Sequence, residues 1–245
     1  MKTMIREIPN GTKAILMIHG ILGRPGHFTP FMDSIPEDFS VYNILLDGHG
    51  GSAKDFSRSS MKKWRMQALT WAKKLTEQYE TVVIAGHSMG CLFAIEAAAL
   101  YPQQIKAIFL LAPALRIRLT FSAVWGSIKT ALGVSADHDP VMRAKLDACG
   151  VVLPSNPLQY LSWLPRFAEL LMESAAVRKQ AANLLVPSVV MLSKKDELVS
   201  PKSGSCFSSL ATIRILPDST HYYYPPADLK TIRNVLHEVC CSVSE

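Results

Sequence analysis

The pentapeptide GHSMG at residues 86–90 has the residue types and spacing of a serine nucleophile. It lies between the β-branched run TVVIA and the apolar stretch CLFAIEAAAL, so we expect a strand to turn sharply into a helix at Ser88. Such a turn raises the serine hydroxyl above the sheet. A side chain at Gly86 or Gly90 would collide as the strand and the helix close around it. The context therefore predicts a catalytic serine rather than an incidental turn.

A serine hydroxyl is a weak nucleophile that needs a general base, and the base needs an acid to orient it. After a turn of this kind the chain order is serine, acid, histidine, with each group at the carboxyl end of a strand. Asp196 ends the run VVMLSKK, and His221 follows RILPDST. Position selects His221, because the other six of the seven histidines precede Ser88, lie on the last predicted helix or fall in a long insertion.

Two other carboxyl groups compete with Asp196 for the role of the acid. Glu197 is its neighbour, and Asp218 lies three residues before His221. Asp218 fits a turn in the sequence Pro-Asp-Ser. Chain order therefore favours Asp196.

The sequence HGILG at residues 19–23 follows the apolar run AILMI. A loop at this place can offer a backbone N–H to an oxyanion, together with the N–H of the residue after the nucleophile. This arrangement predicts Ile21 and Met89 as donors. We interpret His19 as a structural side chain that holds the loop by a hydrogen bond. The glycine-rich DGHGGS at residues 47–52 lacks the spacing of a dinucleotide or phosphate loop, so we interpret it as a structural turn.

The chain has 245 residues, of which 49% are hydrophobic and 19% charged, which is enough apolar character for one globular core. This composition excludes disordered and collagen-like chains. No apolar run reaches the ~18 residues of a membrane span. The beginning MKTMIREIPNG meets charge and proline before a signal-peptide core could form. We therefore expect no stable membrane insertion and no secretion by that route.

The net charge of +6 comes from basic residues that are scattered in ones and twos. This pattern indicates a solvated surface rather than a nucleic-acid interface. The five cysteines are odd in number and include no C-x-x-C pair, which argues against a disulfide framework or a zinc site. Reduced thiols predict a cytoplasmic protein.

Six short apolar runs rich in β-branched residues alternate with helical patterns. Because the runs are apolar on both faces, they predict a mostly parallel sheet covered on both sides, which is a doubly wound α/β fold. Apolar residues at helical spacing predict one helix over 64–79 and another from about Ala227. The six predicted strands lie at 14–20, 41–48, 81–88, 107–114, 188–196 and 211–218.

Between Pro113 and about Ala182 the strand pattern stops, and only helical apolar segments interrupted by proline remain. A structureless loop of this length is uncommon in a compact domain, so we interpret the stretch as a helical insertion. We therefore predict a core formed by residues 1–113 and 183–245, with a small helical cap at 114–182.

The aromatic cap residues Phe121, Trp125 and Trp163 have two interpretations. They could line a pocket for the acyl group of a substrate, or they could be the buried core that a small helical unit needs. The excess of basic over acidic residues in the insertion is compatible with an anionic substrate.

The motifs together resemble the α/β-hydrolase family. HGILG, DGHGGS, GHSMG, KKDELVSP and STH stand in the family's order, and the resemblance runs from about Lys13 to the last helix. The chain is most similar to small bacterial carboxylesterases and monoacylglycerol lipases, which have the same HGxxG and a compact helical cap. The resemblance implies Ser88, Asp196 and His221 as a catalytic triad, with no metal or cofactor.

The expected activity is hydrolysis of short- or medium-chain acyl esters or monoacylglycerols through an acyl-enzyme at Ser88, with a small-molecule ester as the partner. The same triad in this fold can cleave carbon–carbon bonds or thioesters, and these activities are alternatives. A more distant alternative is a homologue that binds a ligand without catalysis, because a fold does not fix a function. The run Tyr222–Tyr224 has no functional interpretation from the sequence.

Overall fold

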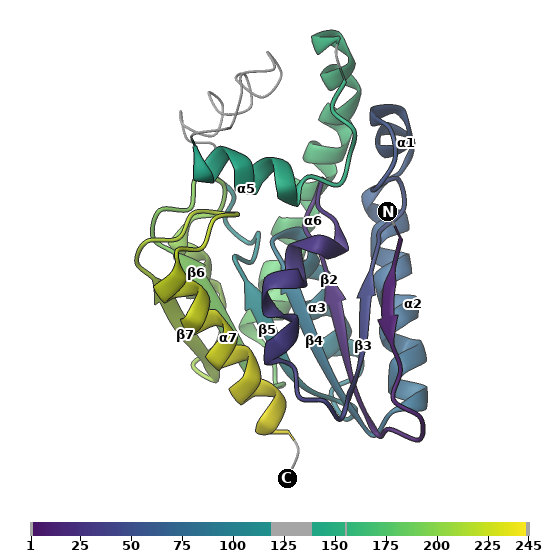
Figure 1. Cartoon of the computed structure of the whole chain (residues 1–245), viewed down its shortest axis with the longest axis vertical. Helices are drawn as coiled ribbons and strands as arrows, with labels where there is room; N and C mark the ends of the chain where they lie inside the picture. The colour runs from purple at the N-terminus through teal and green to yellow at the C-terminus, as the bar shows by residue number, and fades with distance from the viewer. Residues whose placement is uncertain (1, 119–138, 155, 244–245) are drawn as a thin grey trace.

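The computed structural model describes residues 2–118, 139–154 and 156–243. In this part of the chain seven strands form one sheet, in the order β1-β3-β2-β4-β5-β6-β7 (Figure 1). Every neighbouring pair is parallel except β1 with β3. The strands are β1 (Met4–Arg6), β2 (Lys13–Ile18), β3 (Phe39–Ile44), β4 (Thr81–His87), β5 (Ile105–Leu111), β6 (Ser188–Ser193) and β7 (Ala211–Leu216).

The six predicted strands are confirmed as β2 to β7, and the fold is the predicted doubly wound α/β type. Strand β1, which pairs antiparallel with β3, is not predicted from the sequence. The three residues of β1 are all exposed. A strand this short cannot show the two-residue period from which strands are recognised.

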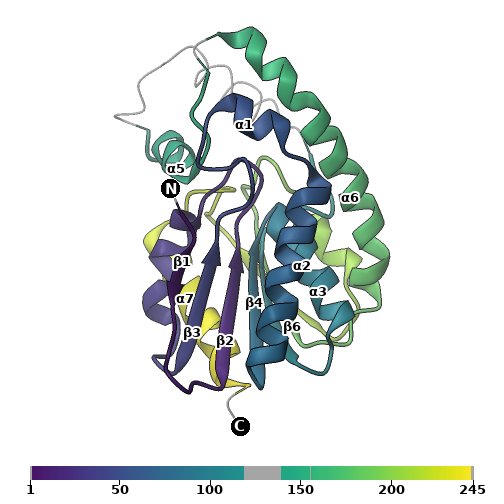
Figure 2. The same cartoon turned by 90° about the vertical axis from the view of Figure 1, so that its right-hand side faces the viewer.

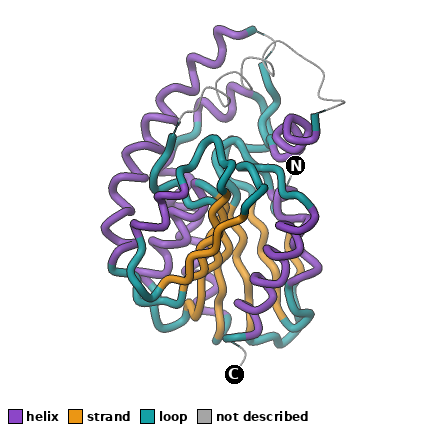
Figure 3. Tube along the Cα trace, turned by 90° about the vertical axis from the view of Figure 1, so that its left-hand side faces the viewer, coloured by secondary structure: helices purple, strands orange, loops and turns teal. Residues whose placement is uncertain are grey.

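Helices cover both faces of the sheet (Figure 3). α2, α3 and α6 pack on one face, and α7 and the 3₁₀ helix η1 pack on the other. The α-helices are α1 (Ala53–Arg58), α2 (Met61–Gln78), α3 (Met89–Leu100), α5 (Pro140–Ala148), α6 (Leu164–Ala182) and α7 (Pro226–Cys241). The 3₁₀ helices are η1 (Pro25–Ser34), η2 (Pro157–Trp163) and η3 (Pro201–Cys206).

Strand β2 shows how one strand contributes to two hydrophobic cores. Ala14, Leu16 and Ile18 face the core of α2, α3 and α6, whereas Ile15 and Met17 face the core of η1 and α7. All five side chains are fully buried. Because successive side chains of a strand alternate between the faces, a strand covered on both sides has a nearly continuous run of apolar residues.

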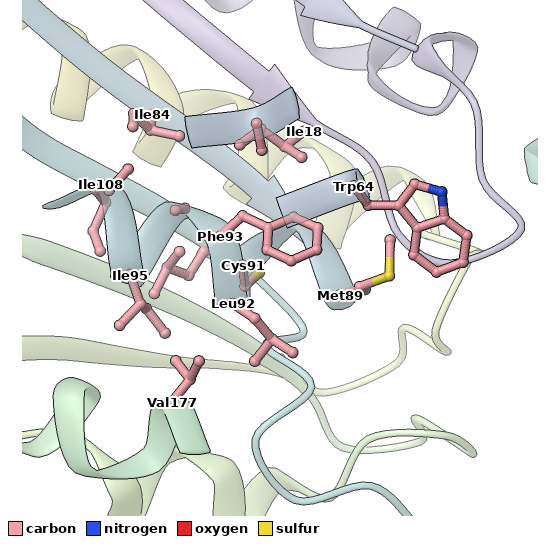
Figure 4. Close-up of a cluster of buried hydrophobic side chains, with 14 of the residues drawn as sticks. Ile18, Trp64, Ile84, Met89, Cys91, Leu92, Phe93, Ile95, Ile108 and Val177 are labelled. Atoms are coloured by element: carbon pink, nitrogen blue, oxygen red, sulfur yellow. The ribbon is translucent and has the colours of Figure 1, made fainter. Parts of the chain in front are cut away.

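Helix α3 lies at the centre of the larger core. Figure 4 shows its side chains among those of Ile18 and Ile84 from the strands and Val177 from α6. Glu96 is the charged residue of this helix, and it is buried. Its Oε1 atom accepts a hydrogen bond of 2.8 Å from Nε of Arg65 on α2. This pairing compensates for the loss of water around the carboxylate.

The described part of the predicted cap contains α5, η2 and α6. Figure 2 shows α5 and the first turns of α6 beyond the carboxyl ends of the strands, and the rest of α6 running down beside α3. Val177 and Ala181 of α6 belong to the core around α3. The last turns of α6 therefore help to cover the sheet, and the division into a core and a cap at 114–182 stays a prediction.

All five cysteines lie in the described part of the chain and have free thiols. None of the helices there has the length and apolar character of a bilayer-spanning segment. The cytoplasmic location stays a prediction.

The beginning of α3 passes very close to the end of β2, and two glycines make this approach possible. A Cβ atom on Gly90 would collide with the carbonyl oxygen of Ile18. A Cβ atom on Gly86 would lie 2.7 Å from the Cα atom of Cys91. Both obstacles are backbone atoms, which cannot rotate away as a flexible side chain can. Glycine at these positions therefore determines how tightly the helix follows the strand.

Substitution of Gly90 should be far more costly than substitution of a glycine with free space. We expect Gly90→Ala to lower the free energy of unfolding by at least about 3 kcal/mol, because backbone must move to admit the methyl group. Gly26→Ala is the control, since its added Cβ would meet only side-chain atoms of Arg24, at 3.4 Å or more. It should change stability by less than about 1 kcal/mol. Urea unfolding of the two variants measures the difference, and equal effects would contradict the prediction.

Candidate active site

Ser88 lies at the junction of β4 and α3 in a strained backbone conformation. Its φ and ψ angles are 54° and −114°, a combination that residues with a side chain rarely adopt. Its N–H donates to the carbonyl of Leu111 on β5 at 2.9 Å. Its carbonyl accepts from the amides of Cys91 and Ala114, both at 3.2 Å. Three main-chain hydrogen bonds therefore hold the sharp turn that the sequence predicts here.

Asp196 and His221 form a buried hydrogen-bonded pair. Asp196 Oδ2 lies 2.8 Å from His221 Nδ1, and each side chain is 1% exposed. Asp196 Oδ1 accepts the amides of Leu198 at 2.8 Å and Val199 at 2.7 Å. With Nδ1–H donating to the carboxylate, Nε2 of the ring carries a lone pair. Nε2 is buried and has no hydrogen-bond partner among the described residues, so it is available to accept a proton.

The two competing carboxyl groups have other partners. Asp218 is exposed and pairs with a surface lysine at 2.7 Å. Glu197 Oε2 accepts the main-chain N–H of His221 at 3.2 Å. Glu197 Oε1 lies 2.6 Å from Nζ of Lys145 on α5. The contact with the imidazole therefore belongs to Asp196, while Glu197 connects the backbone of His221 to a helix of the predicted cap.

The loop that carries Asp196 pairs with the chain that leaves β5. Ile117 and Val199 form an antiparallel bridge, and Arg118 Nε donates to the carbonyl of Asp196 at 3.1 Å. This pairing fixes the position of the acid from the side of β5.

The residue next to Ser88 contacts His221 directly. The ring centroids of His87 and His221 are 4.8 Å apart, and His87 Nε2 lies 3.2 Å from the carbonyl oxygen of His221. Ser88 follows β4, and His221 lies on the loop after β7. The fold therefore brings the predicted nucleophile and the predicted base to the same edge of the sheet.

In the turn after β2, two main-chain amides already donate hydrogen bonds within the protein. The N–H of Gly23 donates within the turn at 3.0 Å, and the N–H of Leu22 donates to His49 Nε2 at 3.1 Å. These bonds engage both amides that follow Ile21. Met89 is the first residue of α3, so its N–H has no carbonyl acceptor within the helix. Ile21 and Met89 flank the site from two elements, and their role as oxyanion donors stays a prediction.

His19 and His49 hold the main chain around this turn. His19 Nδ1 lies 2.8 Å from the carbonyl oxygen of Gly20, and its Nε2 accepts the amide of Leu46 at 3.1 Å. His49 Nδ1 lies 3.2 Å from the carbonyl oxygen of Asp47, while Nε2 of the same ring accepts the amide of Leu22 in the turn. The predicted structural role of His19 is confirmed, and the DGHGGS turn supplies a second histidine with the same role.

Burial keeps four histidines around the site neutral. It lowers the pKa of His19 to about 4 and the pKa of His27 to about 3. It holds the pKa values of His49 and His87 well below 6.5. The rings of His27 and His87 are 3.9 Å apart, so a positive charge on either would further oppose a charge on the other. At pH 7 these four imidazoles therefore act as neutral hydrogen-bonding groups.

Three side chains around His221 are not predicted as site residues from the sequence. The ring of Tyr222 packs edge-on against the ring of His221, with centroids 4.7 Å apart. The hydroxyl of Tyr224 donates to the carbonyl of His221 at 3.1 Å. The ring of His27, from η1 and far away in the sequence, packs against the ring of His87. For the tyrosines the one available signal was their position directly after His221.

Of the three aromatic cap residues, Phe121 and Trp125 lie outside the described residues. Trp163 is 3% exposed, and its Nε1 donates to the carbonyl of Ala53 at 3.3 Å. Its ring lies 5.2 Å from the ring of Phe56. This packing is typical of a core residue, and a contact of Trp163 with substrate stays a prediction.

The sequence profile of the Hydrolase_4 family, described as serine aminopeptidase, S33, matches residues 9–225. The chain belongs to this family. It is an α/β-hydrolase, as its fold and its sequence motifs predict.

Individual relatives of this Hydrolase_4 member are lipases by name. LipV of Mycobacterium tuberculosis (strain ATCC 25618 / H37Rv) is 31% identical over 176 residues, which are 64% of this chain and 65% of LipV. Lipase 3 of Moraxella sp. (strain TA144) is 28% identical over 147 residues, which are 58% of this chain and 43% of that lipase. The chain therefore spans less than two thirds of the length of either relative. The crystal structure of Paleococcus ferrophilus monoacylglycerol lipase shares the fold, with a TM-score of 0.69 and 17% identity over 100% of both chains.

The neutral histidines predict a loss of stability in mild acid. Below pH 6.5 the histidines of the unfolded chain bind protons, whereas His19 stays neutral in the folded chain until about pH 4. The unfolded state then binds more protons, so the free energy of unfolding falls as the pH falls through this range. Between pH 7 and pH 5 the native chain should lose about 2 kcal/mol more than a His19→Gln variant. Urea unfolding at several pH values tests this expectation, which identical pH dependence in the two proteins would contradict.

Proposed function

We propose that the chain is a serine hydrolase of carboxylic esters, with Ser88 as nucleophile, His221 as base and Asp196 as orienting acid. The observation that carries the proposal is the buried hydrogen bond of 2.8 Å from His221 Nδ1 to Asp196, with Nε2 left unpartnered among the described residues. A base with a fixed tautomer and an open nitrogen is what a serine hydroxyl needs to become a nucleophile.

The proposed mechanism has two half-reactions. In the first, Nε2 of His221 takes the hydroxyl proton of Ser88 while Oγ attacks the ester carbonyl. The amides of Ile21 and Met89 stabilise the negative charge that develops on the carbonyl oxygen. The intermediate collapses to an acyl-enzyme as the imidazolium gives its proton to the leaving alcohol. In the second, Nε2 takes a proton from water, whose oxygen attacks the acyl carbon. The imidazolium then returns this proton to Oγ of Ser88 as the acyl–oxygen bond breaks, which releases the carboxylic acid and restores the serine.

We propose short- or medium-chain acyl esters or monoacylglycerols as the substrates. The names of the two lipases similar in sequence support an ester of this kind. In this proposal the helices of the predicted cap, 114–182, cover the acyl chain of the bound substrate. They are suited to that role because α5 lies beyond the carboxyl ends of the strands (Figure 2).

Hydrolysis of p-nitrophenyl esters from acetate to laurate tests the activity. We expect kcat/KM to rise to a maximum at one chain length, because a pocket of fixed size fits one acyl group best. Ser88→Ala should lower kcat at least about 10⁴-fold without loss of stability, since it removes the nucleophile. Substantial hydrolysis by the purified variant would contradict the mechanism.

A second outcome of the same experiment separates the chemistry from the substrate. A fluorophosphonate labels a serine only where a base activates it. If Ser88 is labelled but every ester is left intact, the triad is competent and the ester assignment is wrong. Carbon–carbon or thioester substrates would then replace esters in the proposal.

The role of the acid can be tested with a matched pair of isosteric substitutions. Asp196→Asn keeps the size of the side chain but removes the charge and the correct acceptor for Nδ1–H, so kcat should fall about 10³–10⁴-fold. Asp218→Asn removes the same charge from the exposed pair with Lys195, which is 2.7 Å long, and should change kcat less than about threefold. Steady-state kinetics on the best ester measures both, and similar losses in the two variants would exclude Asp196 as the specific acid.

A further inference from the structure

We propose that Tyr224 is a positioning residue for His221, and that its hydroxyl acts together with the imidazole of His87 by holding the main-chain carbonyl of His221. The inference rests on the proposed function of His221 as the general base. It also gives a role to the tyrosine run that the sequence alone leaves unexplained.

Two donors converge on one carbonyl oxygen. Tyr224 Oη donates to the His221 oxygen at 3.1 Å, and His87 Nε2 lies 3.2 Å from the same oxygen. A carbonyl oxygen has two lone pairs, so it can accept both bonds at once. A carbonyl oxygen can only accept hydrogen bonds, so Nε2 of His87 must carry the proton in this contact. His87 is therefore the Nε2–H tautomer.

The main-chain N–H and the ring Nδ1 of His221 also have hydrogen-bond partners. Its main-chain N–H donates to Glu197 Oε2 at 3.2 Å, and its ring Nδ1 lies 2.8 Å from Asp196 Oδ2. Nε2 alone is without a partner among the described residues. Every polar atom of His221 except the one that the proposed chemistry uses is therefore fixed by a hydrogen bond.

The donors themselves are oriented from η1. His27 Nε2 lies 3.5 Å from Tyr224 Oη, and the His27 ring packs against the His87 ring with centroids 3.9 Å apart. The ring of Phe31 packs against Tyr224, with centroids 5.7 Å apart. The hydroxyl proton of Tyr224 points to the carbonyl of His221. In the contact with His27 the hydroxyl oxygen is therefore the acceptor, and Nε2–H of His27 is the donor. Burial raises the pKa of Tyr224 well above its usual value, so the hydroxyl keeps the proton that it donates.

His221 needs this support because no helix or strand carries it. It lies in the loop between β7 and α7, which is closed by a bond of 3.0 Å from the amide of Thr220 to the carbonyl of Tyr223. A catalytic group must stay within about 0.5 Å of its productive position to be fully effective. In a loop, side-chain bonds to the backbone are what supply this precision.

The three adjacent tyrosines provide an internal control. Tyr224→Phe removes a single hydroxyl and its bond to His221 but keeps the ring against Phe31. Tyr223→Phe removes a hydroxyl one residue away, where the residue contributes main-chain bonds to the loop through its N–H and its carbonyl. The two variants have the same change in composition, but only Tyr224→Phe removes the hydroxyl that contacts the carbonyl of His221 and Nε2 of His27.

The experiment compares both variants with the native chain in kcat and KM for the best p-nitrophenyl ester, in the rate of fluorophosphonate labelling of Ser88, and in urea unfolding. We expect Tyr224→Phe to lower kcat and the labelling rate about tenfold with KM nearly unchanged. Tyr223→Phe should stay within about twofold of the native values. A merely structural role of Tyr224 would lower stability without this selective loss of kcat, and that result would overturn the inference. Equal rates for the two variants would also overturn it.

At position 87, a side chain that can still donate a hydrogen bond to the carbonyl of His221 should keep part of the labelling rate. His87→Gln keeps an amide N–H that can reach the carbonyl of His221, whereas His87→Leu has no donor. We expect labelling of Ser88 to be faster in His87→Gln than in His87→Leu, and the reverse order would count against the role of His87. Failure of the ester assignment is a separate result, because it shows as a native chain that is labelled without hydrolysing esters. The labelling ratios still decide the inference in that case.

Discussion

The turn at Ser88 is the constraint on which the rest of the site depends. Its φ of 54° costs about 1–3 kcal/mol, which surrounding contacts must offset. The main-chain bonds of Ser88 to Leu111, Cys91 and Ala114 and the burial of α3 supply that compensation, and glycine at positions 86 and 90 lets the helix approach β2. The strain is therefore maintained by the core of the fold, and the position of the serine hydroxyl is as rigid as that core.

The histidines around the site show how polar loops are buried without charge. Loop amides and carbonyls covered by other elements need partners, and a neutral imidazole offers one donor and one acceptor. His19 donates from Nδ1 and accepts at Nε2, while His87 donates from Nε2. Burial keeps these rings neutral, so none of them places a positive charge beside His221. One histidine can then serve as base while its neighbours serve only as supports.

Much of this arrangement could be predicted from local sequence. Strands such as β2 appear because burial on both faces makes nearly every position apolar, and chain order selects Ser88, Asp196 and His221. β1 is not predicted because it is short and exposed. η1 is not predicted because its buried residues follow no sustained hydrophobic period. The contact by which His27 orients the hydroxyl of Tyr224 joins residues 197 positions apart, which no local pattern records. Side-chain positions at loop ends are set by tertiary contacts, so they are visible only in the folded chain.

The described part of the insertion is tied to both halves of the site. The amide of Gly150 donates to the carbonyl of Leu22 at 2.7 Å, next to the predicted oxyanion donor. Lys145 of α5 pairs with Glu197, whose other oxygen holds the backbone of His221. A shift of α5 would therefore disturb the turn that carries Ile21 and the loop that carries His221 together. A substrate that contacted this helix would for that reason alter the geometry of the predicted oxyanion donor and the predicted base at the same time.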